Sequence, residues 1–195
     1  MRKYSKMTIK QFLIKISEIL DELKIDYAIS GGVAVSVWGR PRYTADLDIV
    51  TKIDNANQIE NLVKILLKNI KGSYADEAAA LEAFQRKSEF NLVESEYGLK
   101  ADFFVIGHDE YQKQELKRAK KKRIAGKMVK FISPEDLIIS KLKWYQENQS
   151  DRQIEDILTV LEAGNIDMRY LHSWIKKLEL EDGWEKTSQH KKGQH

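Results

Sequence analysis

Apolar residues recur at every third or fourth position in several stretches of the chain, a spacing that is typical of amphipathic helices. Near the N-terminus, Phe12, Ile16, Ile19 and Leu23 follow this spacing and predict a helix over residues 8–24. Further helices are predicted over residues 33–38, 55–71, 76–87, 109–123, 135–148, 151–163 and 168–178.

Short apolar or alternating segments predict strands over residues 27–30, 47–53, 89–97, 100–106 and 127–132. Because strands cluster before residue 133 and helices dominate after it, this order predicts an α+β, or mixed α/β, fold class. We expect an α/β module over residues 1–132, a helical module over residues 133–180 that begins at a Ser133-Pro134 helix start, and a frayed polar tail over residues 181–195.

The composition excludes several classes of protein. The 195 residues are 42% hydrophobic and 32% charged, with two prolines, which excludes a collagen-like or largely disordered chain. The chain has no cysteine, so disulfides, thiolate metal sites and cysteine nucleophiles are excluded. No signal-peptide pattern is visible and the longest apolar run, residues 27–38, is too short to span a bilayer. We therefore expect a soluble cytoplasmic protein with no membrane partner.

The net charge is only +3, but basic residues crowd the segment from Lys117 to Arg123. Such a segment fits RNA, whose phosphates it would contact, or it forms the solvated face of a helix, which is the commoner outcome. Because no aromatic residues are interleaved with the lysines, the solvated face is favoured. RNA stays an open candidate partner.

Candidate chemistry begins with Asp46 and Asp48, which would project together from a strand because residues two apart share a face. Two neighbouring carboxylates repel each other unless a cation neutralises them, and hard oxygen ligands at this spacing suit magnesium. Upstream, Ser30, Gly31 and Gly32 lead from a strand into a helix, where glycines let backbone N–H groups approach an anion. The alternative is a surface turn with capping aspartates.

Asp102 is a third candidate, because a carboxylate within an apolar strand is costly to bury unless it is paired or bound to a metal. Glu94 and Glu96 lie in a more polar strand and are expected to face solvent.

With these residues the sequence resembles the nucleotidyltransferase fold of the DNA polymerase beta superfamily, and in particular stand-alone bacterial nucleotidyltransferases such as the abortive-infection toxin group and its uncharacterised relatives. The resemblance covers about residues 25–175. The residues that carry it are Gly31, Gly32, the segment from Arg40 to Asp48, Asp102, residues 131–138, Lys141, Arg152 and Asp156.

The resemblance implies roles for these residues. Asp46 and Asp48 would hold Mg²⁺ (or Mn²⁺) ions that bridge a nucleoside triphosphate, and Asp102 would complete the second metal site or accept a proton from the acceptor hydroxyl. Lys141 would contact the triphosphate unless it extends to solvent, with Asp156 holding it in place or facing the acceptor. The expected nucleotide-binding set is Ser30, Gly31, Gly32, Arg40, Arg42, Lys141 and Asp156, and the expected catalytic set is Asp46, Asp48, Asp102 and Lys141.

We therefore expect a magnesium-dependent nucleotidyltransferase that transfers a nucleoside monophosphate from a triphosphate to RNA, a protein hydroxyl or a small molecule such as an antibiotic. Pyrophosphate would be released. The chain length also fits the toxin of a toxin–antitoxin pair, with an antitoxin as partner. The alternative is a non-catalytic nucleotide- or RNA-binding module that retains the fold.

Overall fold

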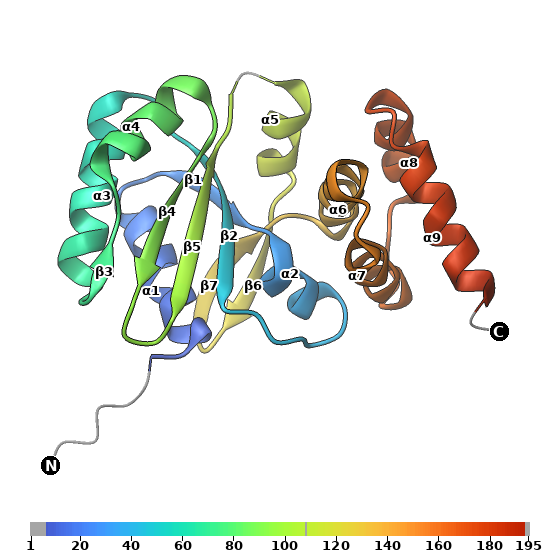
Figure 1. Cartoon of the computed structure of the whole chain (residues 1–195), viewed down its shortest axis with the longest axis horizontal. Helices are drawn as coiled ribbons and strands as arrows, with labels where there is room; N and C mark the ends of the chain where they lie inside the picture. The colour runs from blue at the N-terminus through green and yellow to red at the C-terminus, as the bar shows by residue number, and fades with distance from the viewer. Residues whose placement is uncertain (1–6, 108, 194–195) are drawn as a thin grey trace, which may run out of the picture. The chain divides into compact units, whose positions relative to one another are not determined.

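The computed structural model of the chain describes residues 7–107 and 109–193 and divides into two compact units (Figure 1). Unit 1 comprises Met1–Val33 and Tyr43–Phe131, and unit 2 comprises Ala34–Arg42 and Ile132–His195. Residues 34–42 are thus grouped with the C-terminal helices, and the module boundary expected at residue 133 stays a prediction. Within unit 2, the indole Nε1 of Trp38 donates a hydrogen bond to the carbonyl oxygen of Ile132 at 2.9 Å.

Unit 1 is built on a mixed sheet whose seven described strands follow the order β3-β4-β5-β2-β1-β7-β6 (Figure 1). The strands are β1 (Asp26–Ile29), β2 (Asp46–Lys52), β3 (Ser73–Tyr74), β4 (Glu89–Glu94), β5 (Leu99–Val105), β6 (Lys120–Ile124) and β7 (Lys127–Phe131). β2 runs parallel to β5 and β1 runs parallel to β7, whereas the other neighbours are antiparallel. The expected mixed α/β fold class is confirmed.

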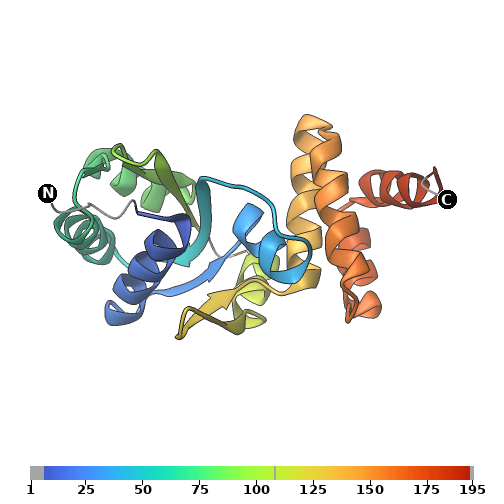
Figure 2. The same cartoon turned by 90° about the horizontal axis from the view of Figure 1, so that it is seen from below.

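The helices of unit 1 are α1 (Ile9–Glu22), α3 (Ala56–Asn69), α4 (Glu77–Arg86) and α5 (Glu110–Lys117). α1 contacts β1, β2 and β7, and Figure 2 shows α1 and α3 side by side. Leu47 and Ile49 of β2 and Ala101 and Phe103 of β5 are fully buried. The odd-numbered residues of the two central strands thus form the core, and the even-numbered residues occupy the other face.

Unit 2 is helical. Its helices are α6 (Pro134–Asn148), α7 (Asp151–Glu162), α8 (Met168–Lys177), α9 (Glu181–Gly193) and most of α2 (Gly31–Trp38). The helix start predicted at Ser133 is confirmed, since its side chain accepts a hydrogen bond from the backbone N–H of Asp136 at 3.1 Å. In the described part of the chain, no helix is both long and apolar enough to cross a membrane.

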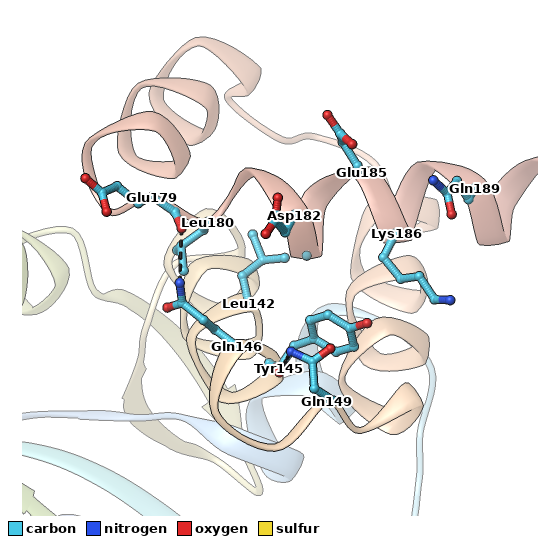
Figure 3. A pocket seen from close by; sticks show the side chains of 11 residues that line it. Leu142, Tyr145, Gln146, Gln149, Glu179, Leu180, Asp182, Glu185, Lys186 and Gln189 are labelled. Atoms are coloured by element: carbon cyan, nitrogen blue, oxygen red, sulfur yellow. Dashed lines mark hydrogen bonds between the residues drawn. The ribbon is translucent and has the colours of Figure 1, made fainter.

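Residues 181–193 form the helix α9, which differs from the frayed tail expected from their polar composition. Gly183 is buried against α6, where an added Cβ would lie 3.1 Å from side-chain atoms of both Leu142 and Tyr145. A pocket of about 260 Å³ is lined by residues of α6, of α9 and of the segment just before α9. Figure 3 shows these side chains and the hydrogen bond that the Gln146 side chain donates to the carbonyl oxygen of Glu179. A tertiary contact, which composition does not encode, orders this segment.

The basic segment also differs from expectation, because the helix predicted over residues 109–123 ends at Lys117 and residues 120–124 form β6. β6 and β7 are joined by Ala125 and Gly126, whose φ angles of +46° and +88° suit a two-residue hairpin turn. Lysine has little preference for strands, so it is the pairing with β7 that decides the structure of this segment.

Candidate active site

β2 positions two carboxylates on one face of the sheet. Asp46 and Asp48 are two residues apart, and the intervening Leu47 is fully buried in the core. Asp46 is exposed and Asp48 is half-buried. The buried apolar residues of β2 therefore anchor the strand and leave both carboxylates on the face opposite the core.

β5 places a third carboxylate beside them. In the parallel pair formed by β2 and β5, Asp48 lies opposite Asp102 and Asp46 lies opposite Lys100. The side chain of Asp102 is 14% exposed. The structure thus brings the three aspartates singled out from the sequence together on one face, and we call Asp46, Asp48 and Asp102 the aspartate cluster.

A lysine lies among these carboxylates. The Nζ atom of Lys100 is 2.9 Å from Oδ2 of Asp102. This hydrogen bond raises the pKa of Lys100, and the charges of Asp102, Asp46 and Glu89 raise it further, while partial burial opposes the shift. Lys100 was not singled out from the sequence, although its spacing of two residues from Asp102 was an available signal.

The turn that opens α2, formed by Ser30, Gly31 and Gly32, packs against Asp48, and we call it the glycine turn. The backbone N–H of Ser30 donates to the carbonyl oxygen of Asp48 at 2.8 Å. Gly31 has a φ of +57°, and a Cβ at this position would lie 1.7 Å from Oδ2 of Asp48. Because no side chain fits there, the position of the Asp48 carboxylate requires glycine.

Within unit 2, Arg42, Lys141 and Asp156 form a second group of charges, which we call the buried ion cluster. Nζ of Lys141 lies 3.0 Å from Oδ2 of Asp156, and Nε of Arg42 lies 3.1 Å from Oδ1. Lys141 is only 7% exposed and Asp156 only 4%. Lys141 therefore does not extend to solvent but is held by Asp156. Two cations share one carboxylate, so the cluster has a net positive charge.

Arg40 lies apart from this cluster, on the surface of unit 2. Its guanidinium pairs with Glu162 at 2.6 Å, and the two side chains are 78% and 45% exposed. Exposed pairs of this kind contribute little to stability.

The aspartate cluster suits a small, hard cation. Within the described residues, no group of three or more His, Asp or Glu side chains is arranged to hold a metal ion. Magnesium needs only one or two protein carboxylates when substrate phosphates supply the remaining ligands. Asp46 and Asp48 on β2 meet that requirement, and Asp102, opposite Asp48 on β5, offers a third carboxylate.

Two polar residues of β4 lie where the sequence analysis did not place them. Glu94, expected to face solvent, is fully buried and accepts hydrogen bonds from the backbone N–H groups of Glu96 and Tyr97 at 3.1 and 2.9 Å. It stabilises the β4–β5 turn. Asn91 lies opposite Asp102 and extends the polar row across a third strand, which only the register of the hairpin reveals.

Comparisons with known proteins place the chain among nucleotidyltransferases. A sequence model of the aminoglycoside-2''-adenylyltransferase family matches residues 12–146. No curated protein matches the chain.

Several solved structures have a similar fold. The antibiotic-resistance factor ANT(2'')-Ia has a TM-score of 0.59 and 16% identity, over 95% of this chain and 100% of the other. The lincosamide antibiotic adenylyltransferase LnuA, bound to lincomycin, has a TM-score of 0.56 and 16% identity, over 82% of this chain and 100% of the other. An antigenic nucleotidyltransferase-like protein from Paracoccidioides brasiliensis is 25% identical, with a TM-score of 0.52, over 79% of this chain and 74% of the other.

Proposed function

The chain belongs to the aminoglycoside-2''-adenylyltransferase family of nucleotidyltransferases, and from this premise we propose that it transfers a nucleoside monophosphate from a triphosphate to a hydroxyl of a small-molecule acceptor. The observation that carries the proposal is the aspartate cluster on one face of β2 and β5. The superfamily resemblance and the enzyme class expected from the sequence are confirmed by family membership.

In the proposed reaction, the acceptor oxygen forms a bond to the α-phosphorus, and the bond from that phosphorus to pyrophosphate breaks. Asp46 and Asp48 would hold the divalent cation, and Asp102 would either complete the metal site or take the hydroxyl proton. Bound Mg²⁺ or Mn²⁺ would neutralise charge on the triphosphate and on the leaving pyrophosphate. Glycine at position 31 leaves the space that the Asp48 carboxylate occupies.

Two groups of residues are separate candidates for contact with the phosphates of the nucleotide. In unit 1, the glycine turn offers backbone N–H groups at the start of α2, where anions are favoured. In unit 2, the buried ion cluster has one positive charge in excess, and Nη1 of Arg42 is buried without a hydrogen-bond partner among the described residues. Arg40 is the weaker candidate, because it is exposed and paired with Glu162.

A small molecule is the favoured acceptor, because ANT(2'')-Ia is an antibiotic-resistance factor and LnuA is an antibiotic adenylyltransferase. RNA on the β6–β7 hairpin is the second candidate. Of the basic residues on that hairpin, Lys127 and Lys130 are paired with Glu18 and Asp26 at 2.6 and 2.9 Å, which leaves less charge for phosphates. A toxin role with an antitoxin partner stays a prediction from the sequence, and family membership favours the enzyme over a non-catalytic binding module.

We predict that Asp46→Asn and Asp48→Asn each lower pyrophosphate release by about a hundredfold or more, because each removes a charged metal ligand. The melting temperature should not fall appreciably, because each substitution relieves repulsion among the carboxylates. The assay incubates the full chain with Mg²⁺, each nucleoside triphosphate and a panel of hydroxylated antibiotics.

Asp54→Asn is the matched control, because Asp54 follows β2 and pairs with Lys52 outside the aspartate cluster. It should release pyrophosphate at the wild-type rate. Wild-type rates in Asp46→Asn and Asp48→Asn would refute the site, and no release by the wild-type chain with any acceptor would refute the function.

A further inference from the structure

The proposed chemistry gives no role to Lys100. Its ammonium lies 2.9 Å from Oδ2 of Asp102, and it is the register partner of Asp46. The Lys100 side chain is 42% exposed, so its flexible stem has room to turn outward. The chain therefore places a cation of its own within the group of carboxylates that we assign to a metal.

The charges on this face explain why a lysine lies there. Carboxylates on adjacent strands repel one another, and the carboxylate of Glu89 adds to the negative field that acts on Lys100. The ammonium offsets part of this repulsion. The same ammonium would also repel a divalent cation at these carboxylates, because like charges a few ångströms apart repel each other even where water partly screens them.

We propose that Lys100 is a counter-ion that a divalent cation displaces from Asp102, so that this lysine weakens metal binding in the absence of nucleotide. The inference rests on the metal site of the proposed function. A positioning role for Lys100 would have the opposite effect on metal affinity, because Lys100 would then orient Asp102 for the metal and strengthen binding. Removal of the ammonium distinguishes the two.

The test titrates Mn²⁺ into the full chain without nucleotide and measures free Mn²⁺ by electron paramagnetic resonance. Lys100→Met keeps most of the apolar stem and removes the charge, and it is expected to lower the Kd for Mn²⁺ by about fivefold or more. Lys100→Arg keeps the charge and should bind Mn²⁺ like the wild type. Lys52→Met is the matched control, because Lys52 has the same two-residue spacing to Asp54, at 3.3 Å, and lies at the other end of β2.

An unchanged or higher Kd in Lys100→Met overturns the proposal, as does the absence of Mn²⁺ binding to both proteins. Urea unfolding without metal gives a second measurement. Lys100→Met should destabilise the wild-type chain more than it destabilises the Asp102→Asn variant, and equal effects in the two backgrounds also overturn the proposal.

Failure of the proposed function gives a different result. A chain that shows the expected ratio of Mn²⁺ affinities but releases no pyrophosphate with any acceptor refutes the transfer reaction and leaves the role of Lys100 standing.

Discussion

Two independent restrictions act on Gly31. Its φ of +57° lies in a region that residues with a side chain rarely adopt, and its α-carbon faces the carboxylate of Asp48 so closely that a Cβ would overlap it. Gly98 shows the first restriction without the second, since its φ is +67° and no atom lies within 4 Å of the position that a Cβ would occupy. A comparison of Gly31 with Gly98 therefore separates the cost of the backbone conformation from the cost of a steric overlap with Asp48.

Gly31→Ala is therefore expected to lower the free energy of unfolding by about 2 kcal/mol or more, because the methyl group must push Asp48 aside. Gly98→Ala should cost only about 1 kcal/mol, the cost of the backbone conformation. Urea denaturation of both variants measures the difference, and equal losses would contradict a close approach at Gly31.

Between α6 and α7, stability depends on the buried ion cluster. Asp156 of α7 holds both Lys141 of α6 and Arg42 within unit 2. A buried charge without a partner is destabilising, whereas in the intact cluster each cation is paired with the Asp156 carboxylate. Lys141, which the sequence predicted as a triphosphate contact, thus links α6 to α7 through Asp156.

We predict that Asp156→Ala lowers the free energy of unfolding by about 3 kcal/mol or more, because it leaves two cations without their carboxylate. Glu162→Ala is the control, since it breaks the exposed pair with Arg40 and should cost less than about 1 kcal/mol. Thermal and urea unfolding report both. A small loss in Asp156→Ala would show that water reaches the cluster.

For the chain as a whole, the buried hydroxyl of Tyr27 links stability to alkaline pH. Burial is the main cause that raises the pKa of Tyr27 from 10.0. The folded chain therefore holds this proton more tightly than the unfolded chain does. The resulting stability is fully present below the unfolded pKa and is lost as the pH rises through the folded one.

The free energy of unfolding should accordingly fall as the pH rises above about 10, and Tyr27→Phe should reduce that fall. The pKa of Lys100 is also raised, so the loss of its proton at alkaline pH likewise lowers the free energy of unfolding. Tyr74→Phe is the control, because Tyr74 is 66% exposed. Unfolding curves recorded between pH 8 and pH 11, a range of about three units around the reference value for tyrosine, measure the effect. Identical slopes in Tyr27→Phe and the wild type would contradict the assignment.

Local signals in the sequence determined much of the fold. Apolar spacing gave α1, α3, α7 and α8 close to their observed bounds, and the Ser133 cap gave the start of α6, because these signals act within a few residues of the chain. The two-residue spacing of Asp46 and Asp48 likewise placed both carboxylates on one face of a strand.

Only the tertiary structure decided the remaining features, because each depends on partners far apart in the sequence. Pairing with β7 makes β6 a strand, and packing against α6 makes α9 a helix. The parallel register of β2 and β5 sets Asp102 beside Asp48 and brings Lys100 next to Asp46. Strand register depends on the alignment of whole strands, so the sequence alone could not show that Lys100 lies beside Asp46.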